Sequence, residues 1–319
     1  MKMEYIESIS NYRSFLMGIS IIMIMFFHNL WVRDVIWLMP LNFFGDFGVD
    51  VFLFLSGFGI VYSLRKNNLK TFFKNRFVRI IPLCVICGFS KFLVSHYIIK
   101  NDELWGWQTF IGFDLWYVKA ILILYFLSPF IYRYLAKYGY AILFLAYIIA
   151  IAAIHFTSNG FVCLFAPRIP VYLIGMMVAT NMIVFKKRLL FFSFLLFVIA
   201  ILHRLSFIIS DGLFGNPNGT VLFVSGGIFF FVFLLVQSYV LFQKLFLIPF
   251  IEFLGNHSLE LFIVHVFVYR VIIPEYYRQL PDALIFITAF SLACSLAYVA
   301  YLLKELLLSA FNSDNCRLL

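Results

Sequence analysis

Charged residues are scarce in this sequence. Asp, Glu, Lys and Arg together make up 12% of its 319 residues, whereas an ordinary soluble domain carries about 25%. Hydrophobic residues reach 64%, and the mean hydropathy is +1.00. A soluble fold of this size could not bury so many apolar side chains, so the composition predicts an integral membrane protein whose immediate partner is the lipid bilayer.

Long polar segments are also lacking. The apolar runs predict about ten transmembrane helices, and no connection between them is long enough for a folded soluble domain. We therefore expect an all-α membrane helix bundle, with residues 1–319 forming one integral membrane domain and no separate soluble domain. The predicted helices cover residues 14–31, 43–64, 77–98, 114–134, 140–156, 169–184, 189–209, 220–242, 257–273 and 282–303.

The sequence has no internal repeat, which argues against the commonest transporter architectures. Cysteine is rare as well. Cys84 and Cys87 form a C-x-x-C pair within an apolar run and without a second pair, so we interpret both as packing residues and expect no metal site. The first apolar run lacks an A-x-A-type cleavage site, so we expect it to remain as a helix.

Basic residues outnumber acidic residues by 24 to 15, and they are unevenly distributed. If the N-terminus is cytoplasmic and the helices alternate in direction, most Lys and Arg fall in cytoplasmic segments, as the positive-inside rule expects. The C-terminus is then cytoplasmic too. We attribute the net charge of +9 to membrane topology and anionic lipid headgroups, and we expect no nucleic-acid partner.

Ionisable side chains within the predicted helices are costly in lipid and are functional candidates by default. Two of them, Glu260 and His265, are isolated in sequence, and a structural hydrogen bond explains each as well as a ligand does. The full set is His28, Asp46, Asp50, Lys91, Lys119, His203, Arg204, Glu260 and His265.

The first predicted helix carries Arg13 at its cytoplasmic end and His28 in the outer leaflet. The two residues lie about 22 Å apart along the helix axis and about 60° apart around it. One face of the helix can therefore hold a cation at one end and a proton acceptor at the other. The alternative is a snorkelling Arg13 and a His28 that a neighbouring helix satisfies.

Asp50 lies about two turns into the second predicted helix, at a depth that we expect to match that of His28. A carboxylate beside a neutral imidazole fixes its tautomer and makes it a better base. We therefore predict that Asp50 orients His28 for acid–base chemistry. A buried hydrogen bond that only packs two helices together is the alternative.

Arg76 and Arg79 are three residues apart and share one face at the cytoplasmic end of the third predicted helix. Two guanidinium groups in this arrangement suit a phosphate-bearing ligand. Ordinary anchoring of a basic segment at the membrane surface explains them equally well.

Several sequence blocks follow one another along the predicted helices. They are MGIS from Met17, FFH ending at His28, GVDVFLFLSGFG from Gly48, RFVRIIP from Arg76, LWYVKA from Leu115, LYFLSP ending at Pro129, RIPVYLIG from Arg168 and NHSLELFIVH from Asn256. In this order they resemble the acyltransferase-3 family of membrane-bound O-acyltransferases, which modify bacterial cell-surface glycans. The block from Gly48 is the most specific.

The resemblance implies a bacterial plasma-membrane enzyme that takes an acyl group from cytosolic acyl-CoA, usually acetyl-CoA, and transfers it to a glycan hydroxyl on the outer side. The positions implicated in the family match His28 and Asp50 for catalysis and Arg76 and Arg79 for the donor. The family arginine that stands eleven residues before the histidine is Met17 here. Arg13, one turn lower and about 40° away around the helix, is our candidate replacement.

Trp116, Tyr117 and Arg168 are candidates for binding the acceptor sugar, with interface anchoring as the alternative. Glu260 and His265 are further candidates.

An exporter or flippase of a surface glycan or its lipid-linked precursor would also explain the buried ions. A third interpretation is an inactive relative that serves in assembly. The acceptor, the acyl chain, the oligomeric state and a covalent acyl-histidine intermediate stay open.

Overall fold

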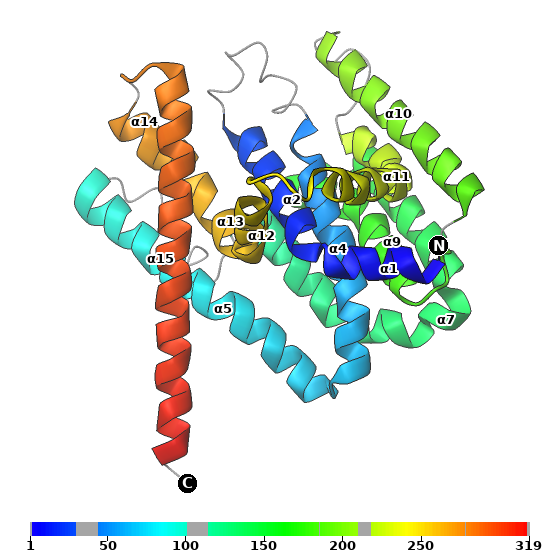
Figure 1. The fold of residues 1–319 in the computed structure, drawn as a ribbon, viewed down its shortest axis with the longest axis horizontal. Helices are drawn as coiled ribbons and strands as arrows, with labels where there is room; N and C mark the ends of the chain where they lie inside the picture. The colour runs from blue at the N-terminus through cyan, green and yellow to red at the C-terminus, as the bar shows by residue number, and fades with distance from the viewer. Residues whose placement is uncertain are drawn as a thin grey trace.

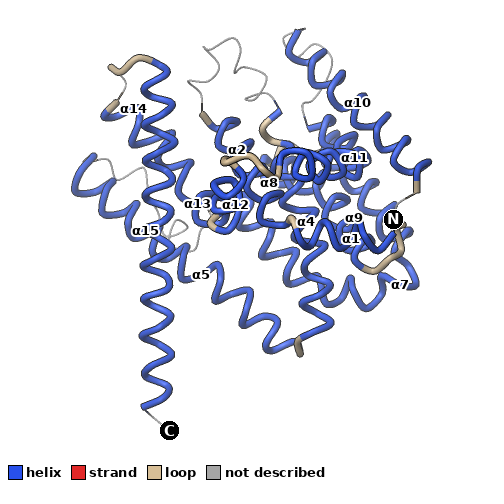
Figure 2. The backbone as a smooth tube through the Cα atoms, viewed as in Figure 1, coloured by secondary structure: helices blue, strands red, loops and turns tan. Residues whose placement is uncertain are grey.

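The structure, a computed structural model, describes residues 2–29, 44–100, 114–184, 186–209, 218–277 and 279–317. These residues are almost entirely helical and contain no strand (Figures 1 and 2), which confirms the predicted all-α class. Among them, seven helices are long and apolar enough to cross a bilayer, or up to nine if each of two bent helix pairs is one span.

The described helices follow one another in chain order. The first half contains α1 (Lys2–Asn11), α2 (Arg13–His28), α4 (Phe47–Lys66), α5 (Leu69–Leu93), the π-helix η2 (Val94–Ile99) and α7 (Trp116–Phe156). The second half contains α8 (Gly160–Phe165), η4 (Ala166–Arg168), α9 (Ile169–Ala179), α10 (Lys187–Ile209), α11 (Asn218–Phe242), α12 (Ile248–Asn256), α13 (Ser258–Phe267), η5 (Val268–Ile272), α14 (Ile273–Tyr276) and α15 (Asp282–Arg317).

The helix α7 takes the place of two helices predicted at 114–134 and 140–156, which join into one element of 41 residues. Gly139 falls in the interval between them, yet it lies within the helix. A glycine inside a helix costs only about 1 kcal/mol relative to alanine. The element is not straight: Lys119 Nζ lies 5.1 Å from the ring centre of Phe161, and Cys163 Sγ lies 3.8 Å from the Ala153 carbonyl. Residues 119 and 153 would be about 51 Å apart in a straight helix, so α7 bends back, and its two arms correspond to the two predicted helices.

The helix α4 forms the centre of the bundle. Of its membrane-spanning window, 78% is buried, against 22% for α7 and for α10. It packs on α2 and α9. On the α9 side, a side chain at Gly57 would meet the Tyr172 carbonyl, and one at Gly175 would meet the Phe54 carbonyl. Such close approach of backbones at small residues is a usual way in which membrane helices pack.

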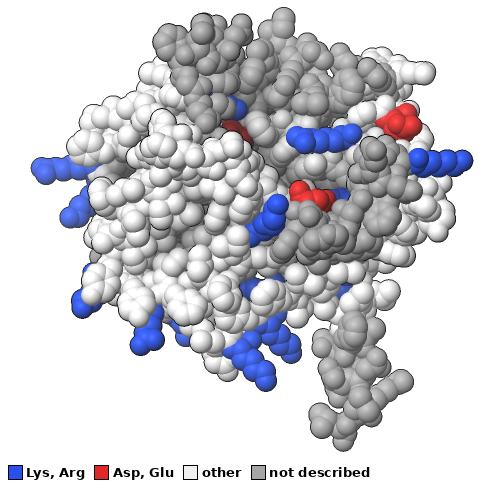
Figure 3. Space-filling view, turned by 180° about the vertical axis from the view of Figure 1, so that it is seen from behind, with Lys and Arg blue, Asp and Glu red and all other residues white. Residues whose placement is uncertain are grey.

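Basic side chains mark one end of the bundle. The turn between α4 and α5, at the lower end in Figure 1, carries the exposed residues Arg65, Lys66 and Lys70. Figure 3 shows Lys and Arg side chains gathered along the same lower edge from behind. This arrangement is the one expected of a cytoplasmic face under the positive-inside rule.

The helices α2 and α12 also cross in direct backbone contact. A side chain at Gly18 would meet the Ile251 carbonyl, and one at Gly255 would meet the Ser14 carbonyl. The next helix, α13, begins directly after α12 at a bend of 79° around His257. The contact of α12 with α2 therefore fixes where this bend lies relative to the start of α2.

We predict that Gly255→Ala destabilises the protein, because its methyl group must push the backbones of α2 and α12 apart. Overpacking of this kind costs about 1–3 kcal/mol. The matched control is Gly160→Ala, since a side chain at Gly160 would meet nothing within 4 Å. We expect the midpoint of thermal unfolding in detergent to fall by several degrees for Gly255→Ala only. Equal midpoints for the two variants would contradict this packing.

Candidate active site

A pocket lies at the point where α2, α4, α5, α7 and α13 meet. Two cations, Arg13 and Arg79, line it together with the hydroxyl groups of Ser56, Tyr117 and Ser258. Its volume is about 50 Å³, which is enough for a small reactive group and too little for a whole coenzyme. The basic and hydroxyl lining suits an anionic or carbonyl-bearing ligand.

Arg13 reaches this pocket from the first residue of α2. Its Nη1 donates a hydrogen bond to the Leu55 carbonyl of α4 at 3.3 Å. Gly59, one turn further along α4, makes room for it, because a Cβ there would lie 2.6 Å from Arg13 Nη1. Met17 lines the same pocket. The structure thus places Arg13 in the pocket that an arginine at position 17 would also face.

The predicted pair Arg76 and Arg79 divides between two environments. Arg79 lines the pocket. Arg76 instead packs on aromatic rings, with its guanidinium carbon 5.2 Å from the ring centre of Tyr125 and 5.7 Å from that of Phe72. Tyr125 is itself a lining residue, so Arg76 lies behind the wall of the pocket and adds positive charge there.

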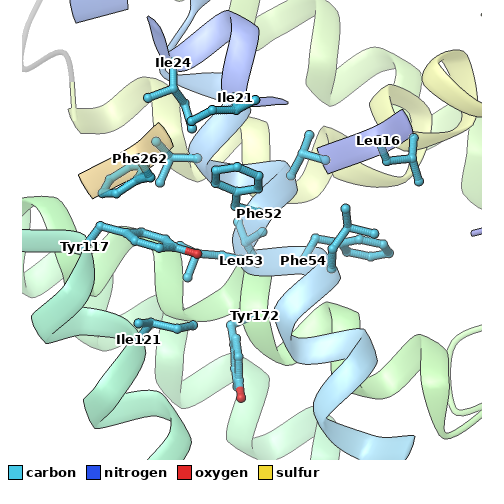
Figure 4. Close-up of a cluster of buried hydrophobic side chains, with 14 of the residues drawn as sticks. Leu16, Ile21, Ile24, Phe52, Leu53, Phe54, Tyr117, Ile121, Tyr172 and Phe262 are labelled. Carbon is cyan, nitrogen blue, oxygen red and sulfur yellow. The ribbon is translucent and has the colours of Figure 1, made fainter. Parts of the chain in front are cut away.

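Tyr117 faces the same pocket rather than standing apart as a separate sugar site. Its ring centre lies 4.6 Å from that of Phe262 and 6.2 Å from that of Phe52. Figure 4 shows its hydroxyl pointing into the middle of this cluster, with Phe262 above the ring. Phe262 is in turn 5.6 Å from the ring of His265. Aromatic contacts therefore run from the pocket to His265.

His28 and His265 are hydrogen-bonded to each other, with His28 Nδ1 3.1 Å from His265 Nε2. Each ring also has its Nδ1 beside the carbonyl one turn earlier in its own helix: Ile24 at 3.0 Å for His28 and Leu261 at 2.9 Å for His265. His265 is fully buried, whereas His28 is half-buried. Two histidines from opposite ends of the sequence thus form one polar site.

The predicted pair of Asp50 with His28 is not formed. A side chain at Gly48 would meet the Ser20 carbonyl, so Asp50 lies beside the middle of α2. The eight residues from Ser20 to His28 raise the imidazole about 12 Å further along the axis. Among the described contacts, the ion pair of Asp50 is with Arg168, at 3.3 Å from Nε to Oδ1.

Arg168 joins a buried ionic cluster near the start of α4. Its Nη2 lies 3.9 Å from Asp46 Oδ2, which is also 3.9 Å from Arg204 Nη2. Its guanidinium carbon lies 5.2 Å from the ring centre of Trp116. Neither Asp50 oxygen accepts a hydrogen bond within the described part of the protein, although both are buried. This cluster has acceptor atoms to offer to a ligand rich in hydroxyl groups.

Glu260, for which the sequence left a structural hydrogen bond and a ligand equally open, is hydrogen-bonded within the bundle. Lys304 Nζ of α15 donates a hydrogen bond to Glu260 Oε1 at 2.6 Å, and both side chains are buried. Glu260 is not among the residues that line the pocket with Arg13. A second ion pair joins Lys91 of α5 to Asp114, which precedes α7, at 2.9 Å. Nothing in the sequence signals either pairing, because the partners lie 44 and 23 residues apart.

A comparison with protein families identifies the family of this chain. The family model described as an acyltransferase domain, that of the acyltransferase-3 family, matches residues 15–302. The chain therefore belongs to the acyltransferase-3 family and is a multi-pass membrane acyltransferase. Searches of curated proteins and of solved structures returned no significant match.

We predict that Glu260→Gln destabilises the fold, because it leaves the buried Lys304 ammonium without a counter-charge. Removing one partner of a buried pair costs about 3–5 kcal/mol. The double variant Glu260→Gln with Lys304→Met should regain most of this loss. Glu305→Gln is the control, since Glu305 is half-exposed and 3.8 Å from the same ammonium. The measurement is the midpoint of thermal unfolding in detergent for the wild type and these three variants. An unchanged midpoint in Glu260→Gln would point to a ligand-binding role for Glu260 instead.

Proposed function

We propose that this acyltransferase moves an acyl group, most simply acetyl, from cytosolic acyl-CoA to a hydroxyl of an extracytoplasmic glycan. We place it in the bacterial plasma membrane, with both termini in the cytoplasm. The observation that carries the proposal is the continuity from a cationic pocket, through aromatic side chains, to a histidine pair. An enzyme that transfers a group across a membrane needs a donor site, a path through the bundle and a base for the acceptor, in this order.

The donor belongs in the pocket of Arg13 and Arg79. The phosphates of coenzyme A carry several negative charges, and guanidinium groups bind phosphate through charge-assisted hydrogen bonds. Arg76 adds positive charge behind Tyr125. The cavity of about 50 Å³ fits the reactive end of the donor. The phosphates then remain outside, toward the basic face at the lower edge in Figure 3.

The acceptor hydroxyl needs a base, and His28 is our candidate. It removes the hydroxyl proton while the oxygen forms a bond with the thioester carbon. The carbon–sulfur bond then breaks, and the proton passes from the imidazolium to the leaving thiolate. No oxidant or reductant is needed. General-base catalysis of this kind contributes about 10²–10⁴-fold in rate.

The ionic cluster of Arg168, Asp46 and Asp50 is our candidate for holding the acceptor glycan. Buried carboxylate oxygens without hydrogen bonds accept readily from sugar hydroxyls. Trp116, which packs beneath the Arg168 guanidinium, offers an aromatic face for a sugar ring. Asp50 would then act on the acceptor rather than on His28.

We predict that purified protein in detergent turns over radiolabelled acetyl-CoA and that His28→Ala reduces this turnover about 10²–10⁴-fold. His155→Ala is the control, because His155 is exposed at the end of α7. Equal turnover by the wild type and His28→Ala would refute the assignment of the base. Absence of turnover, with movement of a lipid-linked glycan across liposomes, would favour the flippase. Mass spectrometry of surface glycans from a deletion strain would identify the acceptor.

A second prediction follows because Arg13 and Met17 line the same pocket. Arg13→Met should raise the KM for acetyl-CoA about 10- to 100-fold, because a charged hydrogen bond is worth about 1.5–3 kcal/mol. The double variant Arg13→Met with Met17→Arg should regain most of the affinity, since both positions face one pocket. An unchanged KM in Arg13→Met would exclude Arg13 from the donor site.

A further inference from the structure

The hydrogen-bond contacts of His28 and His265 fix which ring nitrogen of each side chain carries a proton. A carbonyl oxygen only accepts hydrogen bonds. His265 Nδ1, 2.9 Å from the Leu261 carbonyl, must therefore carry hydrogen. In the neutral ring the remaining nitrogen, Nε2, then presents a lone pair. This lone pair faces His28.

The same reasoning fixes the tautomer of His28. Its Nδ1 lies 3.0 Å from the Ile24 carbonyl and 3.1 Å from His265 Nε2, and both of these atoms are acceptors. One N–H shared between two acceptors is a common three-centre arrangement. The proton of neutral His28 is therefore on Nδ1. Its Nε2 is left with a lone pair and has no hydrogen-bond partner among the described residues.

We infer that His265 is a positioning residue that holds His28 in the Nδ1–H tautomer and stabilises the imidazolium that forms when Nε2 takes a proton. This inference rests on the proposed function. His265 then orients His28, which is the role that we predicted for Asp50 from the sequence. The pair differs from an Asp–His pair in carrying no net charge at rest, which suits a site enclosed by apolar helices.

The surroundings of His265 support a positioning role over contact with substrate. The side chain is fully buried. The rings of Phe262 and Tyr269 lie at 5.6 Å and 5.9 Å with their edges or faces turned against it. Its two ring nitrogens are both occupied, one by Leu261 and one by His28. A substrate would have to displace His28 to reach it.

The test compares His265→Leu with His265→Gln. The glutamine amide oxygen can occupy the place of Nε2 and accept from His28, whereas leucine removes the acceptor. We expect kcat to fall about 10- to 100-fold in His265→Leu, the loss that follows when the partner that orients a metal-ligating histidine is removed. The KM for acetyl-CoA should be unchanged, and His265→Gln should regain most of the loss. His203→Leu is the control, because His203 bonds Thr220 instead.

A second readout does not depend on acyl transfer. In protein labelled with ¹⁵N-histidine, the His28 ring should show protonated Nδ1 and unprotonated Nε2, identified by the loss of its signals in His28→Ala. A His28 with protonated Nε2 would overturn the inference, whether or not the enzyme turns over acetyl-CoA. Unchanged kcat in a folded His265→Leu, or equal loss in the Leu and Gln variants, would overturn it as well. Failure of wild-type turnover with the expected tautomer would count against the proposed function alone.

Discussion

Lipid offers no hydrogen-bond partners, and several buried polar side chains of this bundle find theirs on another helix. Lys304 of α15 meets Glu260 of α13, His28 of α2 meets His265 of α13, and Arg168 meets Asp50 of α4. Each contact joins elements that are distant in sequence. Because an unpaired charge in lipid is so costly, these few contacts restrict how the helices can be arranged.

Glycines complement these polar contacts. They let α4 approach α2 at Gly48 and α9 at Gly57, and they let α2 approach α12 at Gly18. Gly59 shows the connection most directly, because its missing side chain is the space that the Arg13 guanidinium occupies. The donor pocket therefore depends on a residue that has no functional group of its own. Gly59 thus serves both the packing of α4 and the binding of the Arg13 guanidinium in the pocket.

The sequence was sufficient to predict an all-α membrane bundle, because membrane helices follow from apolar run length. It was not sufficient to predict partners. His28 and His265 are 237 residues apart, and no periodicity within one helix reveals which other helix lies beside it. Asp50 illustrates this limit: Gly48 packs beside Ser20, which places the carboxylate well short of His28 and next to Arg168. The family blocks identified the chemistry but not this geometry.

The bend that returns α7 to α8 has a consequence for the surrounding lipid. Exposed aromatic side chains lie along α7 on both sides of its middle, including Phe126, Phe144 and Phe156. Between Phe126 and Phe144, the cations Arg133 and Lys137 are exposed as well. Exposed cations on a membrane helix are favourable at the surface, where they meet anionic headgroups. A bend at these residues lies at the membrane surface, and headgroups bound there would help to hold the helix that carries Tyr117.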